Sequence, residues 1–178
     1  MEDVPDVPND PATSHPIYAP TMIMMGVNQS TTKGYPHPSI SSRTAFQWVL
    51  EKIVKSNVTG FKIHIVHVQV PDVNDDDILE AGSIQNKAEI LLDYFGHQCN
   101  QIGLDCVTKV KKGDPTEVLC SEVSKLQPDF LVVGCRGLTP FQRVFLGTIS
   151  EYCVKYADCP VISIKRKPDE IPPCAIDD

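Results

Sequence analysis

Residues 129–165 read DFLVVGCRGLTPFQRVFLGTISEYCVKYADCPVISIK, and this stretch decides the fold. Its apolar run Phe130–Val133 has the length and continuity of a buried strand. A glycine-punctuated loop follows, then a predicted helix over about Thr148–Tyr156 and a second apolar strand over Pro160–Lys165. A strand, a helix and a strand in this order form a βαβ unit, in which the two strands run parallel.

The same alternation of strand and helix extends upstream from this unit. Earlier strands are predicted over Thr21–Asn28, Phe61–Val70 and Leu104–Val110. With the two strands above, this makes five strands joined by helices. The order predicts an α/β fold, in which an open, five-stranded parallel sheet is doubly wound and Rossmann-like, with helices on both faces.

The helices between these strands are predicted from their caps and apolar spacing. The first follows a serine cap, at Ser39 or Ser41. The third begins clearly, because Asp114 can cap it and Pro115 takes the first helical position. The second helix is predicted over about Ile84–Ile102, where Gly103 ends it, and the third helix ends near Leu126. Two loops are also predicted, a polar one over Gln29–Ser39 and an acidic one over Asp72–Gly82.

Both ends of the chain differ in composition from its middle. Residues 1–20 are acidic and rich in proline, which predicts a disordered N-terminal segment. Residues 167–178 contain three prolines and close on Asp177 and Asp178, which predicts a disordered acidic tail. Residues 21–166 remain as one domain, a size that allows a hydrophobic core.

Charge and composition exclude several classes of function. The formal net charge of the 178-residue chain is -7, from 23 acidic and 16 basic residues, which argues against binding nucleic acid or an anionic membrane. No apolar stretch approaches the roughly 20 residues that span a bilayer, and no secretory signal is visible. The seven cysteines show no C-x-x-C pair and no metal-ligand spacing, so they are expected to be reduced thiols. The expected compartment is the cytoplasm, with the nucleus as a second one.

The predicted sheet places a ligand site before any motif is considered. Ligands of open α/β sheets bind beyond the carboxyl ends of the strands, where the strand order reverses. The reversal is expected between the first and fourth strands, whose following loops begin at Asn28 and Gly134. The second loop carries glycines at Gly134 and Gly137, which let a backbone approach phosphate oxygens, and a helix start at Thr148. The alternative is that these glycines only form the turn between a strand and a helix and bind no phosphate. Two common phosphate-binding motifs, G-x-x-x-x-G-K-[ST] and G-x-G-x-x-G, are both absent from the sequence.

This segment resembles a known family. The spacing of Gly134, Gly137, Gly147 and Thr148 matches the G-x2-G-x9-G-[ST] signature of nucleotide-binding universal stress proteins. The flanking strands match as well, so the resemblance extends over about Thr21–Lys165. The loop sequence KGYPHPS at residues 33–39 is similar to that of the plant, single-domain branch.

The resemblance implies an adenine nucleotide α-hydrolase-like fold and a stress-response protein that binds ATP or AMP, with Mg²⁺ accompanying ATP. It also implies a homodimer formed through the last strand, Pro160–Lys165, which begins with a proline as edge strands can. The family often has Asp where this chain has Asn28, which puts binding strength and base preference in question. By position, the residues implied in nucleotide binding are Gly26, Val27, Asn28 and Val68 at the base and ribose, Val133, Gly134, Arg136 and Gly137 at the ribose and phosphates, and Gly147, Thr148, Ile149 and Ser150 over the phosphates.

Three classes of function follow. The first is a nucleotide-dependent sensor or switch without chemistry of its own. The second is a slow ATP hydrolase, against which the sequence shows no Walker lysine, no paired acids for magnesium and no histidine near the phosphate loop. The third is a redox-responsive or chaperone-like interaction protein with a vestigial site. Cys135 is the cysteine nearest the expected site, and it is expected either as a partly exposed reactive thiol or, preferably, as an unreactive loop thiol.

Overall fold

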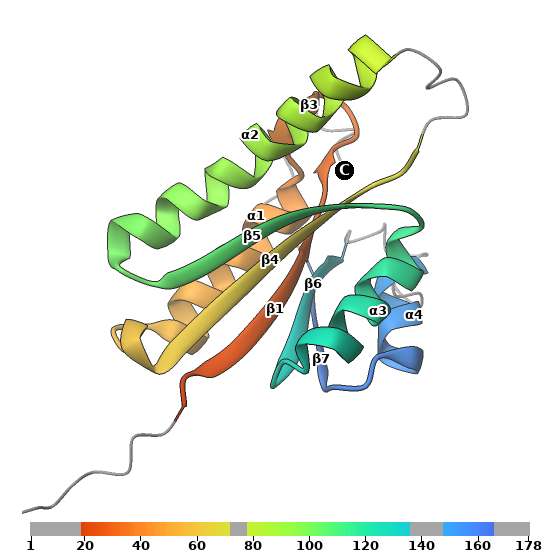
Figure 1. Cartoon of the computed structure of the whole chain (residues 1–178). Helices are drawn as coiled ribbons and strands as arrows, with labels where there is room; N and C mark the ends of the chain where they lie inside the picture. The colour runs from red at the N-terminus through yellow and green to blue at the C-terminus, as the bar shows by residue number, and fades with distance from the viewer. Residues whose placement is uncertain (1–18, 72–77, 136–147, 166–178) are drawn as a thin grey trace, which may run out of the picture.

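The computed structural model describes residues 19–71, 78–135 and 148–165, and its centre is a five-stranded parallel sheet (Figure 1). The strands are β1 (Thr21–Val27), β4 (Phe61–Gln69), β5 (Asp105–Lys112), β6 (Phe130–Cys135) and β7 (Val161–Lys165). Their order in the sheet is β5-β4-β1-β6-β7, and every neighbouring pair is parallel. This confirms the predicted fold class. Apart from Ala19 and Pro20, the predicted disordered ends lie outside the described residues.

The order in which the chain adds strands to the sheet reverses at β1. From β1 the chain adds β4 and then β5 on one side, and it then returns to place β6 and β7 on the other. The carboxyl ends of β1 and β6 are therefore neighbours at a switch point, as the alternation of strands and helices predicts.

Helices cover both faces of the sheet (Figure 1). The first face carries the first two helices and the second face the last two, and each layer seals its own hydrophobic core. The helices are α1 (Ile40–Trp48), which continues as the π-helical stretch η1 (Val49–Val54), α2 (Ile78–Ile102), α3 (Pro115–Leu126) and α4 (Thr148–Tyr156), with a short 3-10 turn η2 (Val58–Gly60) before β4.

The central strand β1 supplies both cores, because successive side chains of a strand point to opposite faces. Ile23 and Met25 lie in the core under α1 and α2, whereas Met24 lies in the core under α3 and α4. All three side chains are fully buried. Phe46 of α1 and Phe95 of α2 meet edge to face, with ring centroids 5.1 Å apart, and join the two helices of the first layer.

The predicted helix ends are confirmed where side chains cap them. Ser39, not Ser41, caps α1, and its hydroxyl accepts a hydrogen bond from the backbone N–H of Ser42. The carboxylate of Asp114 accepts from the first-turn N–H groups of α3, in which Pro115 is the first residue. Gly103 follows α2 with a φ of +73°, a conformation that glycine adopts without strain.

Two predicted loops contain regular structure. Within Gln29–Ser39, an antiparallel pair forms between β2 (Gln29–Ser30) and β3 (Gly34–Pro38). The prolines and Gly34 predicted a loop, but a short two-stranded ribbon tolerates prolines because its strands are edges. The helix predicted to begin near Ile84 already begins at Ile78, so the second half of the predicted acidic loop is helical. Gly82 suggested a loop, yet one glycine costs a helix only about 1 kcal/mol.

The backbone of α1 approaches β6 closely at one glycine. A Cβ atom on Gly134 would lie 2.4 Å from the carbonyl oxygen of Ser41 and 2.6 Å from its carbonyl carbon. These are backbone atoms of the first turn of α1, so they cannot rotate away. The glycine is therefore required for packing the helix on the strand, which is a different role from the phosphate approach that the sequence suggested.

Gly134→Ala should lower the free energy of unfolding by about 3 kcal/mol, because the added methyl group must push α1 off β6. Gly96→Ala is the matched control, since its Cβ would lie at an ordinary 3.6 Å from Thr108 Cγ2. There the change should stabilise the protein by up to about 1 kcal/mol through helix propensity. Chemical denaturation measures both values. Equal, small effects at the two positions would contradict the close packing.

Candidate functional site

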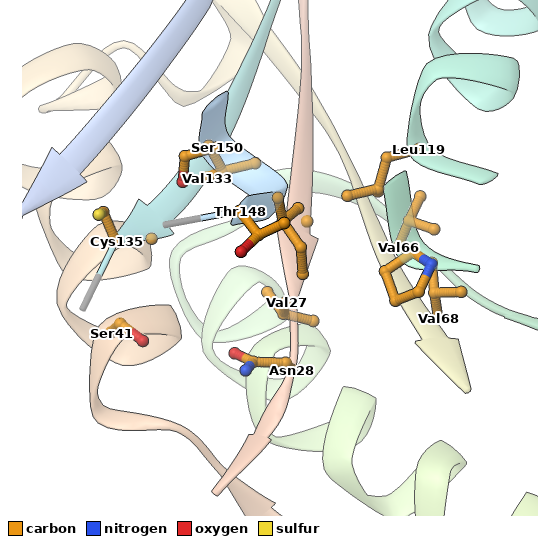
Figure 2. A pocket seen from close by; sticks show the side chains of 14 residues that line it. Val27, Asn28, Ser41, Val66, Val68, Leu119, Val133, Cys135, Thr148 and Ser150 are labelled. Carbon is orange, nitrogen blue, oxygen red and sulfur yellow. The ribbon is translucent and has the colours of Figure 1, made fainter. Parts of the chain in front are cut away.

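A cavity of about 360 Å³ opens at the switch point, beyond the carboxyl ends of β1, β4 and β6 (Figure 2). The first turns of α1, α3 and α4 complete its walls. Its volume lies in the range of small-molecule sites. The lining residues are Gly26, Val27, Asn28, Ser41, Val66, Val68, Pro115, Leu119, Val133, Gly134, Cys135, Thr148, Ile149 and Ser150.

The two ends of this cavity differ in chemistry. Val66 and Val68 from β4, together with Leu119 from α3, form an apolar end. Hydroxyl groups gather at the opposite end, from Thr148 and Ser150 on α4 and from Ser41 on α1. Val27 and Asn28 lie between the two ends in Figure 2. The cavity therefore suits an elongated ligand with a flat apolar part and a polar or anionic part.

Most of the residues expected from the sequence meet in this cavity. Nine of them line it, namely Gly26, Val27, Asn28, Val68, Val133, Gly134, Thr148, Ile149 and Ser150. The other three, Arg136, Gly137 and Gly147, lie outside the described residues.

Five lining residues were not among the expected nucleotide-binding residues, although Cys135 was expected near the site: Ser41, Val66, Pro115, Leu119 and Cys135. Val66 could have been found, because it precedes Val68 by two positions and so shares its face of β4. Pro115 begins a helix that follows a strand, a position that always lies at this edge of a parallel sheet. Ser41 and Leu119 reach the cavity through helix packing, which no local pattern in the sequence reports.

The side chain of Asn28 is held by the cap of α1. Its Oδ1 accepts hydrogen bonds from the hydroxyls of Ser39, at 2.6 Å, and Ser42, at 2.8 Å. Its backbone N–H donates to the Ser42 hydroxyl at 2.9 Å, and both serines are buried. The amide nitrogen makes no hydrogen bond within the described residues, so it stays available as a donor to a ligand.

A buried histidine fixes the strand end that carries Asn28. His67 Nδ1 lies 3.0 Å from the carbonyl oxygen of Val27, and since that oxygen can only accept, Nδ1 carries the proton. Nε2 then accepts from the hydroxyl of Tyr35 at 2.6 Å. Burial lowers the pKa of His67 and raises the pKa of Tyr35, which favours the neutral imidazole and the protonated hydroxyl that this arrangement needs. Strand β3 is thereby fastened to β1 and β4.

Cys135 lies in the cavity wall, and of the two forms expected for it the less favoured one, a partly exposed reactive thiol, is wrong. Its side chain is 2% exposed. The physical reason is that Cys135 is the last residue of β6 rather than a loop residue, so it is packed as part of the sheet. Within the described segments, none of the six cysteines present forms a disulfide.

The fold and the cavity define a doubly wound α/β protein with a cavity at the topological switch point. Residues 35–165 match the model of the universal stress protein family, and the chain belongs to that family. It is 49% identical to a universal stress protein A-like protein of Arabidopsis thaliana, over 89% of this chain and 98% of that protein.

Solved structures agree with this assignment. A universal stress protein family protein from Arabidopsis thaliana, crystallised with AMP bound, is 46% identical and superposes with a TM-score of 0.74 over 89% of this chain and all of that one. The universal stress protein UspA from Lactobacillus plantarum, at 18% identity, shares the fold with a TM-score of 0.60 over 83% of this chain and 99% of its own. In the described part of the chain, no helix combines the length and apolarity that crossing a membrane requires.

Tyr35→Phe should lower the free energy of unfolding by about 1–2 kcal/mol, because Nε2 of the buried His67 loses its donor. Tyr94→Phe is the matched control, since the Tyr94 side chain is 41% exposed and its hydroxyl makes no hydrogen bond within the described residues. Its effect should stay within about 0.5 kcal/mol. Urea denaturation compares the two variants, and an unchanged midpoint in Tyr35→Phe would show that this hydrogen bond does not hold β3.

Proposed function

We propose that the cavity binds an adenine nucleotide, AMP or ATP, and that the protein acts in the stress response as a nucleotide-dependent sensor or switch. The observation that carries this proposal is the cavity itself, which joins an apolar slot to a hydroxyl-lined helix start at the switch point. The relative with bound AMP, at 46% identity, supports the choice of ligand.

The apolar end is the proposed base site. Val66, Val68 and Leu119 offer flat aliphatic surface on which a purine can pack. Gly26 keeps this end open, because a Cβ there would come within 3.1 Å of Leu119 Cδ1. Asn28 follows at the middle of the cavity, where its free amide nitrogen can donate to a ribose oxygen or to the base edge.

The opposite end is the proposed phosphate site. The first N–H groups of α4 and the hydroxyls of Thr148 and Ser150 can donate to phosphate oxygens, and the helix dipole favours an anion there. Arg136, Gly137 and Gly147 are proposed, from the family resemblance, to complete this end. Mg²⁺ is proposed only as the counter-ion of bound ATP, since the described residues contain no cluster of His, Cys, Asp or Glu suited to a metal ion.

A binding role without catalysis fits the chemistry of the lining. Among the described lining residues there is no carboxylate, histidine, lysine or tyrosine that could act as general acid or base. The same residues supply hydrogen-bond donors, which hold a nucleotide without cleaving it. The state of occupancy is then the signal that the protein carries.

Thr148→Val tests the phosphate site while keeping the shape of the side chain. Losing one hydroxyl should weaken AMP and ATP binding several-fold, or by about 1 kcal/mol, in calorimetric titrations. Thr108→Val, on β5 and away from the cavity, should leave both affinities unchanged. Wild-type protein should hydrolyse ATP no faster than buffer does. Unchanged affinity in Thr148→Val would move the site elsewhere, and ATP hydrolysis that Thr148→Val abolishes would favour the slow hydrolase.

We further propose that two chains form a homodimer through the last strand, Pro160–Lys165. β7 is an edge strand that pairs with β6 on one side only. Val161 and Ile162 are half-buried, with apolar side chains on both faces of that edge. Such an apolar edge, which no other described strand covers, favours pairing with a second chain about a two-fold axis.

Val161→Asp combined with Ile162→Asp should convert the dimer to a folded monomer, because like charges would face each other across the two-fold axis. Ile164 is left unchanged, since it is 9% exposed and belongs to the core itself, whereas Val161 and Ile162 are only half-buried and pack against the margins of the two cores. Val154→Asp, on an exposed position of α4, is the control and should leave the dimer intact. Light scattering measures the mass and circular dichroism the fold. A wild-type protein that is monomeric at high micromolar concentration would contradict this interface.

A further inference from the structure

A second, smaller cavity of about 140 Å³ lies between strand β3, the first turn of α1 and helix α2. Its wall includes the basic residues Lys33, His37 and Arg43, with Ser30 and Tyr94 beside them. We call it the basic cavity. It shares no lining residue with the larger cavity, although the first turn of α1 contributes to both.

The positive charge of the basic cavity has no partner within the described residues. Lys33 and Arg43 take part in none of the ion pairs found there. By contrast, Lys62, Lys111 and Lys125 each pair with a carboxylate. The whole chain carries a net charge of -7, so acidic side chains are plentiful, yet none of the described ones is paired with these cations. Like charges held together in this way favour an external anion.

The basic side chains are presented by an ordered backbone. The buried hydroxyl of Ser30 accepts from the backbone N–H of Lys33 at 3.1 Å and is hydrogen-bonded to Thr32 Oγ1 at 3.2 Å. These bonds fix the turn before β3. Arg43 lies in the first turn of α1, where its backbone N–H donates to the carbonyl of Ser39 at 3.0 Å. The backbone that carries Lys33 and Arg43 is thus fixed before any ligand arrives, and only the exposed side chains must be ordered on binding.

We propose that the basic cavity binds a phosphate-type dianion at a site separate from the nucleotide. Its volume of about 140 Å³ far exceeds the share of one water, about 30 Å³, but falls short of the roughly 300 Å³ at which pockets for larger ligands begin. A small oxyanion fits that size. The formal charges of Lys33 and Arg43 match a dianion better than a carboxylate, and a guanidinium donates to two phosphate oxygens at once. This site does not depend on the proposed function of the larger cavity.

The test is a titration of ¹⁵N-labelled full-length protein with inorganic phosphate, with AMP present to occupy the larger cavity. Amide shifts should move at residues 30–43 as phosphate is added, and a parallel titration with acetate should saturate at higher concentration. If AMP does not bind, phosphate is titrated alone, and shifts at residues 30–43 other than Ser41, which lines the larger cavity, are still distinguished from shifts at residues 26–28 and 148–150. The anion site can therefore still be tested if the proposed nucleotide binding fails.

Lys33→Gln combined with Arg43→Gln should weaken phosphate binding by about a hundredfold, since each of the two charge-assisted bonds contributes about tenfold. Arg43→Lys keeps the charge but loses the paired donation, so it should weaken binding less than Arg43→Gln does. The control, Lys52→Gln with Lys87→Gln, removes the same charge from exposed positions outside the cavity and should have no effect. Absence of shifts at residues 30–43, equal loss in the control, or equal affinity for acetate would each overturn the proposal.

Discussion

The close contact between the first turn of α1 and strand β6 at Gly134 is the constraint on which the rest of the site depends. With only hydrogen at that position, the carbonyl of Ser41 can approach to a distance that a methyl group would forbid. This contact places the serine-rich start of α1 over the switch point of the sheet. There, Ser39 and Ser42 can reach the side chain of Asn28, and Ser41 can line the cavity.

Two sets of hydrogen bonds next to this contact hold Val27 and Asn28, the residues at the carboxyl end of β1. The serine hydroxyls hold Asn28, and His67 with Tyr35 holds the carbonyl of Val27. The first turn of α1 then separates two different chemical environments. On one side is the cavity with an apolar end and a hydroxyl-lined end, and on the other is the basic cavity. The first turn of α1 thus borders both the proposed nucleotide site and the proposed anion site, which share no lining residue.

Features encoded locally could be predicted from the sequence, and features created by packing could not. Alternating apolar runs gave the parallel sheet and its switch point, and the Asp114–Pro115 pair marked the start of α3 because capping involves only neighbouring residues. The β2–β3 ribbon was missed, since its prolines indicate a loop unless the ribbon's exposed edges are known. Ser41 and Leu119 enter the cavity from helices whose placement depends on the whole core, and the burial of Cys135 depends on where β6 ends.

The central claim, that an adenine nucleotide occupies the larger cavity, is tested most directly by native mass spectrometry of the purified full-length protein. We expect a mass increment of one AMP or ATP per chain, retained from the cell or restored by adding micromolar AMP. A protein that carries no nucleotide on purification, and gains none even at millimolar AMP, would contradict the account.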